Sequence, residues 1–115
     1  MNLNIQDYKE TEADVAAEFY HRCKGLGLVA KMEVKLPSDV HRSGFMRADA
    51  LVFQIGKVVC AVEFKGCRRS KMPLNPKSRQ YRAYAGLSIP FFLCSGSDEI
   101  EDTLDDVCAL ADKLI

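Results

Sequence analysis

Residues 47–66 read RADALVFQIGKVVCAVEFKG, and this stretch predicts two β-strands joined by a tight turn. Gly56 separates two apolar, β-branched runs, which is a typical hairpin pattern. Three charged side chains, Asp49, Glu63 and Lys65, lie at the open end of that hairpin. Two carboxylates and one ammonium that converge there have the chemistry to hold a divalent cation beside a polarised phosphate or water.

Whether the two carboxylates meet depends on the register of the hairpin. In a regular hairpin with a two-residue loop, Asp49 and Glu63 face opposite sides of the sheet. A three-residue loop, or one β-bulge, sets them directly across from each other, with Cβ atoms roughly 4.5–5.5 Å apart. Lys65 then lies on the same face as Glu63, because side chains alternate along a strand. The alternative is a solvated strand end that carries ordinary surface charges.

The composition predicts a single folded domain that covers residues 1–115. Apolar residues make up 48% of the chain and charged residues 28%, which is ordinary for a globular protein. No run approaches the ~20 apolar residues of a membrane span, and the N-terminus lacks the features of a signal peptide. The five cysteines show no CxxC spacing, which argues against a zinc site or a disulfide framework and favours a reducing cytoplasm.

Positive and negative charges cancel over the whole chain but are separated along it. Residues 64–97 contain seven basic side chains and no carboxylate, whereas residues 98–115 contain seven carboxylates and one lysine. Polyanion binding depends on local charge, so the basic segment after Glu63 is a candidate for nucleic-acid contact. The alternative is a solvated basic loop that an acidic helix balances.

Caps, glycines and apolar periodicity predict the other helices and strands. Thr11, Ser78 and Ser97 are residue types that cap a helix, and each precedes a helical pattern. The predicted strands cover residues 28–36, 48–54, 58–65 and 89–94. The resulting order, α-β-β-β-α-β-α, indicates an α/β fold with a central mixed sheet flanked by helices.

This order, with Asp49 and the AVEFK strand of residues 61–65, resembles the PD-(D/E)XK nuclease superfamily. Within it, the chain is most similar to virus-type replication-repair nuclease (VRR-NUC) domains and to archaeal-type Holliday junction resolvases. Residues 44–49, GFMRAD, resemble the family's glycine-to-aspartate entry into the second strand, although Ala48 stands where proline is common. The resemblance covers residues 11–110 and implies a restriction-endonuclease-like fold.

The resemblance also implies a reaction, a divalent-metal-dependent hydrolysis of phosphodiester bonds in DNA. Asp49, Glu63 and the backbone carbonyl of Phe64 would bind Mg²⁺ or Mn²⁺, and Lys65 would orient or activate the attacking water. Glu12 matches the carboxylate of the family's first helix and would be a further metal ligand; alternatively, it faces its helix dipole. Gln80 would act as a catalytic residue that hydrogen-bonds near the site, although Ser78 precedes it by two residues rather than the usual three.

The implied partner is branched DNA, such as a Holliday junction, cut by a homodimer in the cytoplasm of a bacterial, archaeal or phage-infected cell. A non-catalytic DNA-binding protein of the same fold, and a general nicking or degradative nuclease, remain as alternatives. His21 and His41 have no partner at catalytic or ligand spacing and are interpreted as surface residues. The expected nucleic-acid contacts are Arg68, Arg69, Lys71, Lys77, Arg79, Arg82 and Tyr84.

Overall fold

The computed structural model describes residues 10–66 and 77–114. Its helices and strands follow the predicted order, with one additional 3₁₀ turn (η3) before the last helix. The predicted loop of residues 66–76 lies, apart from Gly66, outside the described residues. The elements are α1 (Glu12–Gly25), β1 (Val29–Pro37), β2 (Phe45–Gln54), β3 (Lys57–Lys65), α2 (Arg79–Ala85), β4 (Phe91–Ser95), η3 (Ser97–Glu99) and α3 (Ile100–Asp112).

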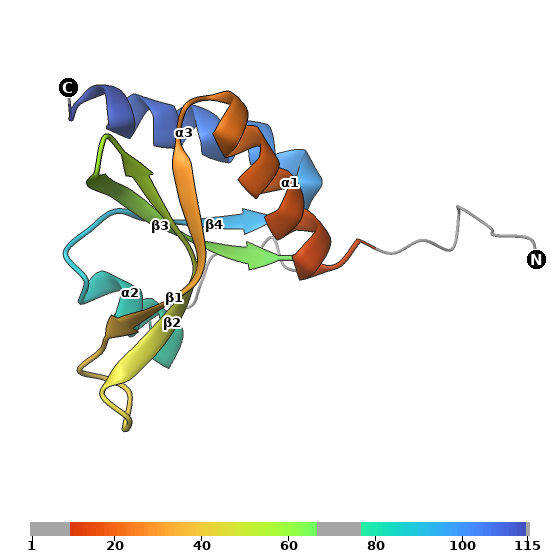
Figure 1. Ribbon diagram of the computed structural model, residues 1–115. Helices are drawn as coiled ribbons and strands as arrows, with labels where there is room; N and C mark the ends of the chain where they lie inside the picture. The colour runs from red at the N-terminus through yellow and green to blue at the C-terminus, as the bar shows by residue number, and fades with distance from the viewer. Residues whose placement is uncertain (1–9, 67–76, 115) are drawn as a thin grey trace, which may run out of the picture.

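The four strands form one mixed sheet in the order β1-β2-β3-β4. The β1–β2 and β2–β3 pairs are antiparallel and the β3–β4 pair is parallel. Helices α1 and α3 cover one face of the sheet, and α2 lies on the other, where it connects β3 to β4 (Figure 1). The predicted α/β class with a mixed sheet flanked by helices is confirmed. No helix in the described part of the chain is long and apolar enough to cross a membrane.

The β2–β3 hairpin turns through Ile55 and Gly56, which both have positive φ angles, 50° and 74°. Two such residues form a type I′ turn, whose twist matches that of the strands. A register shift follows, because Val52 pairs with Cys60 whereas Phe53 pairs with Val58, so one extra residue of β3 bulges. The bulge alternative of the sequence prediction is therefore confirmed.

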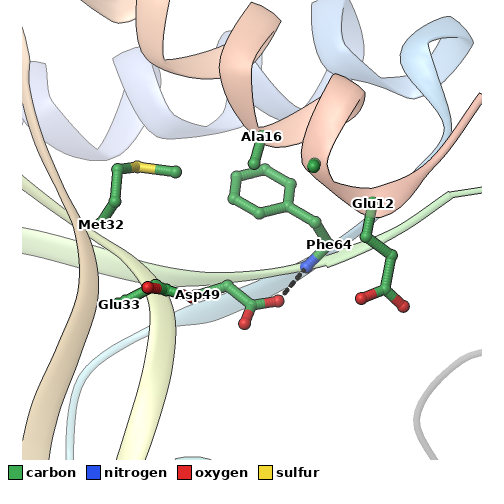
Figure 2. A pocket seen from close by; sticks show the side chains of 7 residues that line it. Glu12, Ala16, Met32, Glu33, Asp49 and Phe64 are labelled. Atoms are coloured by element: carbon green, nitrogen blue, oxygen red, sulfur yellow. Dashed lines mark hydrogen bonds between the residues drawn. The ribbon is translucent and has the colours of Figure 1, made fainter.

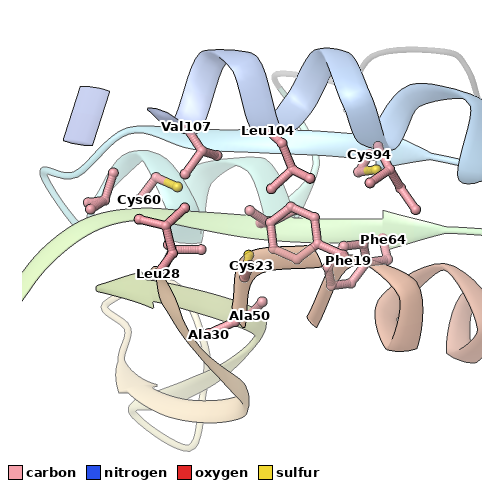
Figure 3. Packing of buried hydrophobic residues seen from close by; sticks show 14 of the residues in the cluster. Phe19, Cys23, Leu28, Ala30, Ala50, Cys60, Phe64, Cys94, Leu104 and Val107 are labelled. Atoms are coloured by element: carbon pink, nitrogen blue, oxygen red, sulfur yellow. The ribbon is translucent and has the colours of Figure 1, made fainter. Parts of the chain in front are cut away.

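Two groups of apolar side chains hold the layers together. The larger group lies between the sheet and helices α1 and α3, and includes Phe19 and Phe64, whose rings meet edge to face at a centroid distance of 5.2 Å (Figure 3). Cys60 is fully buried in this group, and burial raises the pKa of its thiol to about 12, so it packs as an apolar residue. The smaller group lies against α2 and contains Ala83 and Tyr84.

The β1–β2 ribbon changes packing partners halfway along its length. On β2, Ala50 and Val52 pack in the α1–α3 group, whereas Met46 and Ala48 pack in the α2 group. The same change occurs on β1 at Glu33, which has a φ of 53° and interrupts the regular pairing with β2. Even-numbered residues of a regular strand all lie on one face. Because those of β2 pack in two different groups, the ribbon passes from the α1–α3 layer to the α2 layer at this interruption.

Helix starts were predicted with mixed success. Thr11 caps α1 through a capping box with Asp14, in which each side chain accepts from the other's backbone N–H. Ser78 caps α2 by accepting from the Tyr81 N–H at 3.1 Å. The prediction that Ser97 caps the last helix is wrong, because Gly96, with a φ of 85°, directs the chain into η3 before α3 begins.

Candidate active site at the open end of the hairpin

Asp49 ends the regular pairing of β2 with β3. The last regular pair on this side is Ala50 with Val62, and the same register places Asp49 opposite Glu63. Asp49 Oδ2 accepts a hydrogen bond from the Phe64 backbone N–H at 2.9 Å (Figure 2). A backbone donor of β3 is thus satisfied by a side chain rather than by a strand, which fixes the carboxylate beside Glu63.

Glu63 is a buried carboxyl group, with 5% of its surface exposed. Its Oε2 accepts a hydrogen bond from the Tyr84 hydroxyl at 2.7 Å. Burial, with the charge of Asp49 as a smaller cause, raises the pKa of Glu63 to about 7, while Tyr84 and Gln80 act in the opposite direction. A carboxyl group with a pKa near neutrality is a frequent property of functional sites.

Lys65 lies between two carboxylates from different elements. Its Nζ is 3.8 Å from Glu63 Oε1 and 4.0 Å from Glu12 Oε1. The Glu12 side chain is 60% exposed and that of Glu63 is 7% exposed, so Lys65 lies between a carboxylate in solvent and a buried carboxyl group. The predicted convergence of Asp49, Glu63 and Lys65 is present, and Glu12 stands at its margin.

Gly66 sets the position of Glu12 relative to the sheet. A Cβ atom at Gly66 would lie 2.8 Å from the Glu12 backbone nitrogen and 2.9 Å from the Thr11 carbonyl carbon. Only a residue without a side chain permits this approach of the end of β3 to the first turn of α1. The glycine that follows the AVEFK strand therefore brings the α1 carboxylate to Lys65.

A cleft of about 420 Å³ opens on the α1 side of the site. Figure 2 shows Asp49 and Glu12 on opposite sides of Phe64 at this cleft. Glu33, which the sequence alone did not indicate as a site residue, lines the same cleft and lies opposite Asp49 in the β1–β2 register. Glu33 is exposed, and nothing in a glutamate predicts its positive φ. The lining residues are Glu12, Ala13, Ala16, Met32, Glu33, Asp49 and Phe64.

The two carboxylates of the site, Asp49 and Glu63, are ligands of the kind that Mg²⁺ prefers. Within residues 10–66 and 77–114, no group of three or more His, Cys, Asp or Glu side chains could hold a metal ion. Two adjacent carboxylates nevertheless suit Mg²⁺, which is commonly held by one or two carboxylates and otherwise by water and substrate phosphates. Asp49 and Glu63 fit that pattern, because a cation would stabilise the charged form of Glu63, which burial and, to a smaller extent, the charge of Asp49 disfavour.

The remaining predicted residues fall into four groups. Gln80 is close enough to Glu63 to lower the pKa of that carboxyl group, and Lys77, Arg79 and Arg82 are exposed at or near α2. Tyr84 was predicted to contact nucleic acid, and this is wrong, because it is fully buried and its hydroxyl bonds to Glu63. Three predicted contacts lie outside the described residues: Arg68, Arg69 and Lys71.

Comparisons of this chain with protein-family models, with curated proteins and with solved structures find no match. The geometry of the site therefore carries the functional conclusion.

Proposed function

We propose that the protein is a divalent-metal-dependent nuclease that hydrolyses phosphodiester bonds in DNA, with a restriction-endonuclease-like fold. The observation that carries the proposal is the bulge-dependent register that sets Asp49 opposite Glu63, with Lys65 at 3.8 Å from Glu63. A regular hairpin would separate the two carboxylates. Two acids and a lysine at one point, one acid having a pKa of about 7, form a site suited to charge stabilisation.

Each residue has a separate role in this proposal. Asp49, Glu63 and the Phe64 carbonyl would hold Mg²⁺ or Mn²⁺, which when bound polarises the phosphate and lowers the pKa of a bound water. Lys65 holds a positive charge where negative charge grows on the phosphate oxygens. Tyr84 positions the Glu63 carboxylate by a hydrogen bond and Gln80 lowers its pKa, so both act through Glu63 rather than on substrate.

The decisive experiment measures cleavage and metal binding on the same variants. Asp49→Asn and Glu63→Gln should abolish cleavage of labelled DNA in Mg²⁺ and should also lose the rise in melting temperature that Mg²⁺ gives to the wild type. Glu101→Gln, which removes an exposed carboxylate on α3, is the matched control and should behave as wild type. Cleavage at the wild-type rate by either site variant would refute the metal-site assignment.

Substrate preference and assembly belong to the same proposal. Paired cuts in a four-way junction require two active sites, so the preferred branched substrate implies a homodimer. A four-way junction, a flap and a plain duplex, each tested with Mg²⁺ and with EDTA, separate a structure-specific nuclease from a general nicking enzyme. DNA binding without cleavage of any of the three would favour the non-catalytic binding protein. Light scattering at micromolar concentration reports the assembly state.

A further inference from the structure

A second cleft lies on the α2 side of the sheet and, apart from Gln80, has no place in the chemistry described above. It has a volume of about 370 Å³ and lies between the far end of the β1–β2 ribbon, the loop of residues 38–44 and the start of α2. Its described lining residues are His41, Met46, Arg47, Arg79 and Gln80. We refer to it as the arginine cleft.

The arginine cleft is positively charged and its charges are not neutralised locally. Arg47 and Arg79 come from different layers, and none of the described lining residues is acidic. Among the ion pairs within residues 10–66 and 77–114, neither arginine has a carboxylate partner. Lys35, which pairs with Arg47 across the ribbon, adds a further positive charge at the same level. An anion is the ligand that this arrangement favours.

The loop that carries His41 is ordered by its own hydrogen bonds. Ser38 is 8% exposed, and its Oγ lies 2.7 Å from His41 Nδ1. The Ser38 N–H donates to the Gly44 carbonyl, and the Gly44 N–H donates to the His41 carbonyl, both at 2.9 Å. Because Nδ1 is engaged by Ser38, the loop presents the imidazole in one orientation, and the cleft wall is formed in advance of any ligand.

Gln80 connects the arginine cleft to the two carboxylates. Gln80 lines the cleft and is also close enough to Glu63 to lower the pKa of that carboxyl group. A polyanion that passes Asp49 and Glu63 would therefore meet Arg47 and Arg79 on the other side of Gln80. Arginine is suited to that contact, since its planar group binds two oxygens of one phosphate at once.

We propose that the arginine cleft binds a backbone phosphate of a nucleic acid strand next to the one that is cut, with Arg47 and Arg79 as its ligands. The identity of the ligand rests on the proposed nuclease function, whereas the location rests on the cleft itself. Arg79 was expected to contact DNA on charge alone; the structure adds Arg47, which lines the same cleft.

The test measures binding of a fluorescein-labelled single-stranded oligonucleotide by anisotropy in EDTA, where no cleavage takes place. Arg47→Gln and Arg79→Gln should each weaken binding by about tenfold. The double variant should also lower the slope of log affinity against log salt by about 0.7 for each phosphate that is no longer bound. Arg47→Lys with Arg79→Lys keeps the charge without the planar group, and should retain the salt slope but not the full affinity.

The control is Arg22→Gln with Lys24→Gln, which removes the same charge from the last turn of α1. Strand β1 separates that turn from the loop of residues 38–44, a distance of roughly 30 Å for its length. The inference would be overturned if the control double variant lost as much affinity as Arg47→Gln with Arg79→Gln, or if the latter bound the oligonucleotide as the wild type does. A competition experiment gives a further check. If inorganic phosphate displaces the labelled oligonucleotide as strongly as unlabelled oligonucleotide does, the cleft is a site for free phosphate and the inference is overturned.

The two proposals fail separately. A wild-type protein that cuts no DNA, but binds the oligonucleotide through Arg47 and Arg79, would defeat the nuclease and support the arginine cleft. A protein that cuts DNA normally after both arginines are replaced would defeat the cleft and leave the nuclease intact.

Discussion

The Tyr84 hydroxyl donates a hydrogen bond to Glu63 Oε2 at 2.7 Å, and Tyr84 is itself fully buried. The hydrogen bond joins α2 to the end of β3 across the smaller apolar group. The Tyr84 ring also stacks on Phe91 of β4, with centroids 5.3 Å apart and planes at 19°. The orientation of a carboxyl group at the site is thus fixed by the packing of two elements that follow it in the chain.

Tyr84→Phe should shift the pH dependence of the site. The hydroxyl lowers the pKa of Glu63 by stabilising its carboxylate, so its removal moves that pKa above about 7. Mg²⁺ binding and cleavage should then begin at higher pH than in the wild type. The variant should also lose about 1–3 kcal/mol of stability, since a buried oxygen loses its donor, with the larger loss at high pH, where Glu63 is charged.

Tyr20→Phe is the control for that substitution, because Tyr20 is 39% exposed on α1 and its hydroxyl has no role at the site. The measurements are thermal melts and Mg²⁺ titrations across a pH series. A Tyr84→Phe variant with the wild-type pH profile would show that the hydrogen bond does not tune Glu63.

Glu63→Gln should remove a pH dependence of folding stability. The pKa of Glu63 is about 7 in the folded protein, above its ordinary value of 4.5, so the folded state holds more protons between those two values. The stability of the folded state therefore falls as pH rises through this window. The contribution of the protonated Glu63 to stability is complete only at pH values below the window. Glu63→Gln, which has no proton to lose, should become more stable than the wild type as pH rises. Urea unfolding of both proteins across the window measures the difference, and parallel curves would contradict the assignment.

Much of the fold was predictable because its signals are local. The glycine turn, the Thr11 cap and the strand predicted over residues 28–36 each depend on neighbouring residues, and the structure has the turn, the cap and a strand over Val29–Pro37. The β-bulge was identified only as a condition for the carboxylates to meet. No residue type at positions 57–60 specifies it, because a bulge reflects how the whole hairpin packs rather than one side chain.

The parts of the site that were missed depend on contacts between distant segments. Glu33 enters the cleft through the β1–β2 register and a positive φ that its sequence does not indicate. Tyr84 was expected to contact nucleic acid, but helix α2 turns it inward against Phe91. The separation of charge along the chain predicts where a binding region lies. It does not predict which side chains of that region are buried.

Lys65→Ala should reduce turnover with little effect on DNA affinity. The ammonium lies beside Glu63 and Glu12, where it would stabilise charge that develops only in the transition state. Loss of one such group typically costs about 10²–10³ in rate. Single-turnover cleavage beside anisotropy in EDTA separates the two effects. Lys57→Ala, at the turn end of β3, is the control; weaker binding with a normal rate at saturation would instead make Lys65 a phosphate contact.

Gly66→Ala should displace the first turn of α1 from the site. The added methyl group would lie 2.8 Å from the Glu12 backbone nitrogen and 3.1 Å from the Glu10 carbonyl oxygen, and neither backbone atom can move without the helix. We expect a loss of about 1–3 kcal/mol of stability, as for other overpacked positions, and a rate lower than that of the wild type.

Gly25→Ala is the matched control, because a Cβ at Gly25 meets no atom within 4 Å and the residue ends the same helix. Urea unfolding of both variants gives the stability difference. Glu12→Gln distinguishes the two possible roles of the Glu12 carboxylate. If Gly66→Ala slows cleavage and Glu12→Gln does so to the same degree, the position of that carboxylate matters to the reaction. If Gly66→Ala slows cleavage and Glu12→Gln does not, the glycine serves the packing of α1 on β3, and Glu12 is a first-turn residue that faces its own helix dipole.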